Sequence, residues 1–276
     1  MENTVTLNNG VEQPMLGLGT WQLVGSKCYD TVAMALDLGY RHIDTADVYG
    51  NHKEIAGAVS DWISTKNGTR SDIFITSKIW RTDLEKDNLL HAFNRMTEEL
   101  QVDYIDQLLL HWPNKSIPIS SSFEGLEELM EKGLIRSIGV SNCTQNHIDE
   151  IYEFNHTIQV NQVELHPTFN QSEMRTYAQK QNFQLVSYSP LGRNADLENT
   201  TVAGLAEKYS TTPGQVILNW HFRNGLIAIP KASTKNHLED NLQALDWELD
   251  ANDVQLLNDI EQQERMLAPS FNEFGD

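Results

Sequence analysis

Eight short runs rich in Ile, Val and Leu recur along the 276-residue chain, and longer amphipathic stretches separate them. Runs of this kind are typical of strands that are buried on both faces of a parallel sheet. Their alternation with helical patterns predicts right-handed βαβ units. We expect the strands to end near residues 20, 44, 78, 111, 141, 162, 188 and 231. Eight units in unbroken series predict one domain over residues 1–276, a closed (β/α)8 TIM barrel of the α/β class.

The two ends of the chain depart from this repeat. Residues 4–14 alternate apolar with polar side chains and contain Asn9-Gly10, which predicts a small N-terminal β-hairpin. Such a hairpin would plug the N-terminal end of the barrel. Residues 269–276 are expected to form a short C-terminal tail.

Local signals mark several helices. An apolar helical pattern covers residues 30–38, and Gly39 follows it as a stop signal. Asn51 is predicted to cap the next helix, with Glu54 as the returning half of a capping box. Further helices are expected over residues 87–100, 123–130, 145–154, 172–181 and 201–209.

The charge balance restricts the partners of the chain. It has 20 Lys and Arg against 39 Asp and Glu, a net charge of -19, which opposes nucleic acids and anionic membranes. Cys28 and Cys143 are too few for a disulfide scaffold. The sequence has no signal-peptide pattern, no 18-residue apolar run and no metal-ligand spacing among its nine histidines. We therefore expect a cytoplasmic protein without a membrane span or a metal.

Three predicted strands end in complementary polar groups, and a fourth group follows closely. Asp44, Lys78 and His111 each close a strand, and Tyr49 comes five residues after Asp44. Taken singly, each has an ordinary structural interpretation: a helix cap, a surface ion pair, a structural imidazole and a packed ring. Together, on the rim where barrel enzymes carry their chemistry, they predict a catalytic cluster.

The four groups form a consistent acid catalyst. A phenol is a weak acid at neutral pH, with a pKa of about 10. A nearby Lys78 ammonium is expected to lower the pKa of Tyr49, with Asp44 holding Lys78 in place. His111 is expected to donate a hydrogen bond to a substrate oxygen. The arrangement would protonate a carbonyl oxygen as that oxygen gains charge, which carbonyl reduction requires.

Several blocks resemble the aldo-keto reductase superfamily, in order and over nearly the whole chain. The small microbial members, such as diketogluconate reductases and prostaglandin F synthase-like enzymes, are the most similar in length. The blocks are residues 39–46 with 49–51, 105–113, 138–142, 159–162, 187–192 and 229–231. This family does not use a GxGxxG nucleotide loop. The sequence agrees, because residues 17–19 are not followed by the third glycine of that motif.

The resemblance implies an NADP(H)-dependent reductase of aldehydes and ketones, a monomer or weak dimer, with Tyr49 as general acid. It implies that Ser141, Asn142 and Gln162 hold the nicotinamide carboxamide and that Tyr188 stacks on the ring. The resemblance also implies that Ser189 and Leu191 contact the diphosphate of the cofactor. Thr20 and Trp21 would line the nicotinamide end of the cleft.

The adenosine end departs from the family pattern. Lys231, Ser233 and Thr234 match the segment that grips the 2′-phosphate, but His237 stands where many members carry Arg. A neutral His offers one donor where Arg offers a fixed fork. We expect NADPH to bind better than NADH, with NADH still tolerated. The adenine-contacting positions are matched by Asp240 and Asn241.

Two further features leave alternatives open. Arg193 would either add a cation near the diphosphate or point into water, and the sequence favours neither. Trp21, Trp80 and Trp112 at three strand ends predict an aromatic substrate pocket, although each could be simple rim packing.

Two other functions compete with the reductase. Some barrels of this family are cofactor-sensing regulatory subunits with little turnover, and such a module would keep the nucleotide segment. The other is a hydrolase or isomerase that uses Asp44 and Glu164 as a carboxylate pair. The presence of all four catalytic positions favours the reductase.

Overall fold

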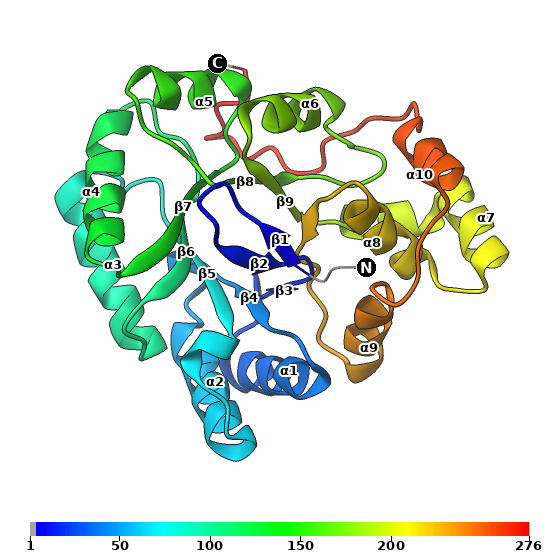
Figure 1. Cartoon of the computed structure of the whole chain (residues 1–276), viewed down its shortest axis with the longest axis horizontal. Helices are drawn as coiled ribbons and strands as arrows, with labels where there is room; N and C mark the ends of the chain where they lie inside the picture. The colour runs from blue at the N-terminus through cyan, green and yellow to red at the C-terminus, as the bar shows by residue number, and fades with distance from the viewer. Residues whose placement is uncertain (1–3, 276) are drawn as a thin grey trace.

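Eight parallel strands form the central sheet, as a computed structural model of the chain shows (Figure 1). The structure describes residues 4–275. The strands follow one another around the sheet in chain order. Their bounds are β3 (Leu18–Gly19), β4 (His42–Asp44), β5 (Phe74–Ile79), β6 (Ile105–Leu110), β7 (Ile135–Ser141), β8 (Val160–Glu164), β9 (Gln184–Tyr188) and β10 (Ile227–Ala228). The predicted barrel and its strand ends are confirmed to within a few residues.

The barrel closes where its first and last strands meet. A parallel bridge joins Leu16 to Ala228, and the Gly19 amide donates to the carbonyl of Pro230 at 3.1 Å. A Cβ atom on Gly19 would lie 2.6 Å from the carbonyl oxygen of Ile229. Only glycine allows the two backbones to approach this closely.

Ten helices among the described residues surround the sheet (Figure 1). They are α1 (Gly25–Leu38), α2 (His52–Lys66), α3 (Lys86–Leu100), α4 (Ile119–Glu131), α5 (Gln145–Glu153), α6 (Ser172–Gln181), α7 (Thr200–Tyr209), α8 (Pro213–Arg223), α9 (Lys235–Gln243) and α10 (Ala251–Asn258). The last three were not predicted. Three short 3-10 segments also occur, at η1 (Asp47–Tyr49), η2 (Arg70–Asp72) and η3 (Gly192–Glu198). None of the helices in residues 4–275 combines the length and apolarity that crossing a bilayer demands.

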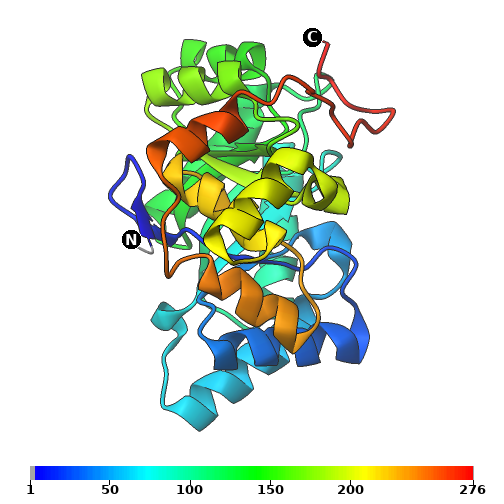
Figure 2. The same cartoon turned by 90° about the vertical axis from the view of Figure 1, so that its right-hand side faces the viewer.

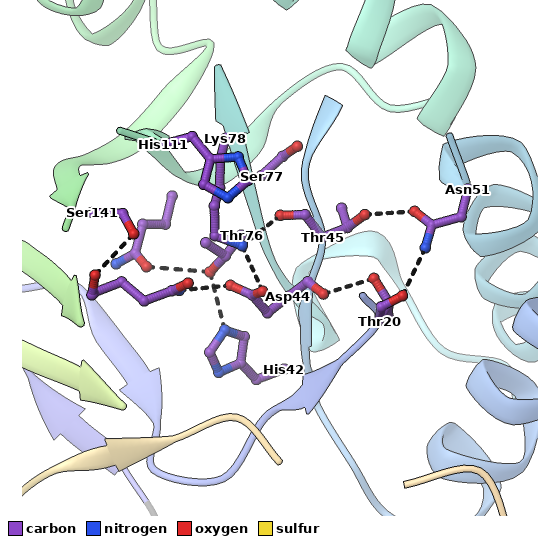
Figure 3. Close-up of polar contacts among 12 residues, drawn as sticks. Thr20, His42, Asp44, Thr45, Asn51, Thr76, Ser77, Lys78, His111 and Ser141 are labelled. Atoms are coloured by element: carbon purple, nitrogen blue, oxygen red, sulfur yellow. Dashed lines mark hydrogen bonds and ion pairs between the residues drawn. The ribbon is translucent and has the colours of Figure 1, made fainter. Parts of the chain in front are cut away.

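The two predicted helix-end signals have different outcomes. Gly39 ends α1 in the left-handed region, with φ of 113°, as expected. The capping box at Asn51 and Glu54 is wrong, because the Asn51 side chain makes no cap bond. It accepts from the Thr45 hydroxyl at 2.7 Å and donates to the Thr20 carbonyl at 3.1 Å (Figure 3). Tertiary partners near the barrel rim therefore use the groups that a cap would need.

The N-terminal hairpin lies across one mouth of the barrel (Figure 1). Its strands β1 (Thr4–Thr6) and β2 (Glu12–Pro14) pair antiparallel. Leu7, only 3% exposed, packs in the barrel interior with Leu109 and Val160. Figure 2 shows the hairpin and the end of the C-terminal segment at opposite ends of the barrel. The hairpin therefore plugs the N-terminal end, as predicted.

Candidate active site

A cavity of about 540 Å³ opens where the strands end at their carboxyl termini. Most of the predicted site residues line it. These are Trp21, Asp44, Tyr49, Trp80, His111, Trp112, Ser141, Asn142, Gln162, Tyr188, Ser189, Leu191 and Lys231. Strands that are neighbours in the sheet bring their last residues to one rim, which explains why residues far apart in the sequence meet here.

A buried ion pair forms the base of the site (Figure 3). The Lys78 ammonium donates to the Asp44 carboxylate at 2.6 Å and to the Thr45 carbonyl at 2.8 Å. The second Asp44 oxygen accepts from Gln162 at 2.8 Å. Burial lowers the pKa of Lys78 and raises the pKa of Asp44, and each charge partly opposes the shift of the other. The predicted role of Asp44 in fixing Lys78 thus has a direct geometric basis.

Tyr49 and His111 lie beside this pair. The Lys78 nitrogen is 5.3 Å from the centroid of the Tyr49 ring. The rings of Tyr49 and His111 meet edge to face, with centroids 5.8 Å apart. The structure therefore brings the four predicted catalytic side chains into one cluster.

The expected lowering of the Tyr49 pKa is wrong for this structure. Burial raises the pKa of Tyr49 well above its usual value, and the charges of Asp44 and Tyr188 add to the increase. Since Asp44 lies 2.6 Å from Lys78, it compensates most of the ammonium's field, and desolvation then dominates. Tyr49 is a fully protonated phenol at neutral pH.

His111 is a neutral imidazole. Burial, with the nearby Lys78 charge, holds the pKa of His111 well below its usual value. Its Nδ1 atom is buried and has no hydrogen-bond partner within residues 4–275. A neutral imidazole has one donor and one acceptor.

Amide and hydroxyl groups line the cavity beyond the ion pair. The Ser141 hydroxyl donates to the carbonyl of Gln162 at 2.8 Å, and the Asn142 side chain donates to the carbonyl of His111 at 2.9 Å. The Tyr188 hydroxyl donates to the side-chain oxygen of Asn142 at 2.8 Å. These bonds fix the orientation of the polar groups that the cavity presents.

Two residues of the cavity lining have unusual backbone conformations. Asn142 follows β7 with φ of 62°, and Ser189 follows β9 with φ of 49°. Non-glycine residues in the left-handed region are uncommon and cluster at functional sites. Each turns the chain sharply as it leaves its strand at the cavity rim.

One end of the cavity is aromatic. Trp80 and Trp112 both contact the ring of Phe271, with centroids 5.6 and 5.4 Å apart. Phe271 also lines the cavity, with Leu267 from the same C-terminal segment. The sequence predicted a C-terminal tail over residues 269–276, and neither Phe271 nor Leu267 was named as a site residue. The two aromatic residues of this otherwise polar tail, Phe271 and Phe274, were the available signal.

The other end of the cavity is cationic. The Arg193 guanidinium lies 5.6 Å from the Trp21 ring centroid, and the Lys231 ammonium lies 5.8 Å from it. Both cations line the cavity, and Trp21 is 45% exposed at its rim. Arg193 lines the cavity and is also exposed to solvent, and its place beside the diphosphate stays a prediction. This cationic end contrasts with the strongly negative chain and suits an anionic group.

The remaining predicted cofactor residues are not in the cavity lining. The Thr20 hydroxyl donates to the Asp44 carbonyl at 2.8 Å and is fully buried. The others lie on the segment that enters α9: Ser233, Thr234, His237, Asp240 and Asn241. Thr234 caps α9 by accepting from the His237 amide, and Asp240 accepts from the side chain of Gln215 at 2.7 Å.

The carboxylate-pair alternative loses its second member. Glu164 is completely buried and does not line the cavity. Its oxygens accept from His166 at 3.2 Å and from the amides of Met266 and Leu267 at 2.7 and 2.9 Å. It therefore has a structural environment. The residues described contain no group of three or more His, Cys, Asp or Glu side chains arranged to hold a metal ion.

Fold and site together define a class of proteins: (β/α)8 barrel enzymes with an active cavity at the carboxyl ends of the strands. The model of the aldo/keto reductase family matches residues 15–262. The chain belongs to this family, and this membership supports an oxidoreductase that acts on carbonyl groups.

Relatives of this family are similar over nearly their whole length. Glyoxal reductase of Bacillus subtilis (strain 168) is 36% identical, with 96% of this chain and 95% of that protein covered. Methylglyoxal reductase DkgA of Escherichia coli (strain K12) is 34% identical, with 98% of both chains covered. The solved structure of the aldose reductase from Schistosoma japonicum has a TM-score of 0.92 and 31% identity, and it covers 97% of this chain and 94% of its own.

Proposed function

We propose that the protein is an NADPH-dependent carbonyl reductase that converts small aldehydes and ketones to alcohols, with Tyr49 as the proton donor. The observation that carries this proposal is the cluster of Tyr49, His111 and Asp44 at the wall of one cavity, with the buried Lys78 paired to Asp44 behind it. A cofactor-sensing module would need none of this acid machinery, which is why the enzyme is the better interpretation.

Tyr49 supplies the proton to the substrate oxygen. Its raised pKa keeps the phenol protonated before reaction. As negative charge grows on the former carbonyl oxygen, that oxygen becomes a far stronger base than a phenolate, so the proton moves to it. The Lys78 ammonium, 5.3 Å from the ring centroid, stabilises the phenolate that remains. Lys78 therefore acts on the charge that develops and does not acidify the resting phenol.

His111 orients the carbonyl group. Because the imidazole is neutral, it offers a single N–H donor to the substrate oxygen. It also leaves the protonation of that oxygen to Tyr49. A donor placed before the reaction costs no reorganisation when charge develops, which is the advantage of a preorganised site.

The polar residues of the cavity suit a nicotinamide cofactor. Ser141, Asn142 and Gln162 would hold its carboxamide, and Tyr188 would pack against the ring. Arg193 and Lys231, both at the cationic end of the cavity, would face the diphosphate, with Ser189 and Leu191. The reduced nicotinamide supplies a hydride when bound. Residues 233–241 would bind the 2′-phosphate and adenine, beyond the cavity.

Compact and uncharged carbonyl compounds are the substrates that the aromatic end favours. Trp80 contacts the ring of His111, and Trp80 and Trp112 contact Phe271, so the aromatic end of the cavity lies beside His111. The two bacterial relatives named above are reductases of glyoxal and methylglyoxal. We propose that the protein works as a monomer or weak dimer in the cytoplasm and has no nucleic-acid or membrane partner.

Mixing the protein with NADPH and either methylglyoxal or 4-nitrobenzaldehyde tests the function. We expect the absorbance of NADPH to fall at a rate proportional to protein concentration, with the corresponding alcohol as product. Tight binding of NADPH without oxidation, with both aldehydes, would instead identify the cofactor-sensing module.

The substitution His237→Arg tests how the protein binds the 2′-phosphate. A guanidinium offers two parallel donors where neutral His offers one, so we expect the dissociation constant of NADPH to fall about tenfold, or ~1.4 kcal/mol. The dissociation constant of NADH, which lacks the 2′-phosphate, should not change. Titration by quenching of protein fluorescence measures both. Equal gains for the two cofactors would exclude a phosphate contact at position 237.

A further inference from the structure

A fully buried cluster of charges lies next to the cavity but outside it. His166, two residues after the end of β8, contacts two carboxylates. Its Nε2 atom is 3.2 Å from Glu164, and its Nδ1 atom is 3.1 Å from Asp196. All three side chains have no solvent exposure. Buried carboxylates require compensation, so this cluster is energetically demanding and needs an explanation.

Hydrogen-bond geometry favours an imidazolium at His166, although its Nδ1 atom also lies 3.2 Å from the Thr168 hydroxyl. Each of its ring nitrogens faces a carboxylate oxygen, and only the protonated ring has two N–H donors. Burial opposes this charge, but the hydrogen bonds and charges of Asp196 and Glu164 outweigh burial and raise the pKa of His166. Burial also opposes the charge of Asp196, which by itself would raise its pKa. The hydrogen bonds from His166 and Thr168 outweigh burial, so the pKa of Asp196 is lowered.

Each carboxylate holds a different wall of the cavity. Glu164 accepts from the amides of Met266 and Leu267 at 2.7 and 2.9 Å, and Leu267 lines the cavity. Phe271 of the aromatic end follows in the same segment. Asp196 belongs to η3, whose Arg193 lines the cationic end.

Asp196 also determines the shape of η3. Thr168 donates to it from both its hydroxyl, at 2.5 Å, and its amide, at 3.2 Å. A Cβ atom on Gly192 would lie 2.5 Å from the Asp196 carboxylate, which shows how tightly the turn folds over this group. Arg193 and Asn194 both have positive φ, of 49° and 78°, so the loop depends on tertiary support.

We propose that His166 is a positioning residue for the cavity: by joining Glu164 to Asp196, it holds the C-terminal segment and the η3 loop in register with each other. The aromatic end and the cationic end of the cavity would then depend on one buried cation. Only the kinetic part of the test below rests on the proposed function.

The surroundings of the cluster make His166 its titrating member. His221 of α8 faces His166, and burial lowers the pKa of His221 to about 4, so it stays neutral. Around Glu164 lie Arg265 and Tyr188. The guanidinium keeps its charge at all accessible pH values, and burial raises the pKa of Tyr188 further above neutrality.

The sign of the pH dependence follows from the raised pKa. Stabilisation by protonated His166 is complete below the unfolded pKa of about 6.5 and is lost as the pH rises through the higher folded value. The two cavity walls should therefore loosen together on the alkaline side. The C-terminal segment keeps a second anchor, because Glu273 accepts from the amide of Lys115 at 3.1 Å. Loss of His166 should loosen this segment without releasing it.

Amide hydrogen exchange of His166→Gln tests the proposal without any ligand. We expect exchange to accelerate about tenfold or more in both residues 192–198 and residues 264–268, with the barrel strands unchanged. The matched control is His156→Gln, which removes a 2.7 Å contact with Glu127 elsewhere on the molecule. The control should leave both segments as they are. Wild-type exchange in both segments, or acceleration in only one, would overturn the proposal.

A second variant keeps the test decisive if His166→Gln does not fold. Asp196→Asn removes one carboxylate and so should lower the pKa of His166. We expect the pH at which the C-terminal amides of residues 264–268 lose protection to shift downwards. Since Asp196 does not touch that segment in the contacts above, an unchanged pH profile there would refute the coupling through His166.

Steady-state kinetics provide the functional readout. In His166→Gln we expect KM for the aldehyde to rise about fivefold while kcat stays within about twofold, because the catalytic cluster is intact. A fall in kcat equal to the fall in kcat/KM would assign His166 to the chemical step and contradict a positioning role. If the protein shows no reductase activity at all, the proposed function fails, and the exchange result still decides the proposal for His166.

Discussion

Replacing Tyr49 by phenylalanine should lower kcat about 10²- to 10⁴-fold, the range associated with loss of a general acid. The substitution removes only the hydroxyl, and the ring can keep its edge-to-face contact with His111. We therefore expect the dissociation constant of NADPH to stay the same. Steady-state rates with methylglyoxal, combined with fluorescence titration of the cofactor, measure the two effects separately.

Tyr177→Phe is the matched control for this experiment. Tyr177 lies on α6 and donates to Asp149 at 2.5 Å, outside the cavity lining. The same loss of a hydroxyl there should leave kcat unchanged. If Tyr49→Phe retained the wild-type kcat, another group would have to be the proton donor, and the proposed mechanism would be wrong.

Lys78→Met should produce the largest loss of stability of any single substitution in the site. It leaves the Asp44 carboxylate buried without its counter-charge. Removing one partner of a buried pair typically costs about 3–5 kcal/mol of unfolding free energy. Urea unfolding at pH 8, followed by tryptophan fluorescence, gives this difference through the midpoint and slope.

The pH dependence and two further variants check the cause. Burial raises the pKa of Asp44, so in Lys78→Met the penalty of ionising it begins above the unfolded pKa of about 3.9 and grows until the pH passes the raised folded value. Adding Asp44→Asn should recover much of the loss. Lys66→Met, at a half-exposed pair with Asp37, should cost less than about 1 kcal/mol. A loss in Lys78→Met that is insensitive to Asp44→Asn would mean that packing, not charge, is responsible.

The framework of the site could be predicted because parallel strands end on a common rim. Asp44, Lys78 and His111 were identified as the residues that close their strands, and the sheet brings these positions together whatever their separation in the sequence. The hairpin could be predicted for a similar reason, since Asn9-Gly10 specifies a tight turn locally. Strand ends and turns are encoded by a few adjacent residues.

Electrostatic effects could not be predicted in the same way. The sequence indicated that Lys78 is near Tyr49, and the structure agrees. The sequence provided no measure of how deeply Tyr49 is buried, or of the 2.6 Å contact through which Asp44 neutralises the charge of Lys78. These two features decide whether the pKa of Tyr49 rises or falls. The same limit applies to Asn51, whose sequence fits a helix cap but whose side chain bonds to Thr45.

Contacts between distant segments were the second limit. Phe271 meets Trp112 although no periodic pattern relates the two positions. Glu164 was considered only as a possible carboxylate of a hydrolase or isomerase, and His166 was not singled out. Their partners, the amide of Leu267 for Glu164 and Asp196 for His166, come from two loops that nothing in the sequence joins to them.

The closure of the barrel has a consequence for how the chain folds. The barrel is closed only when residues near Leu16 meet residues near Ala228. Its first and last strands are therefore separated by most of the chain. Contacts of such long range are the slowest to form. During synthesis the sheet therefore has two unpaired edge strands until the final quarter of the chain is available. The rim that carries Asp44 is complete only after these two edges have paired.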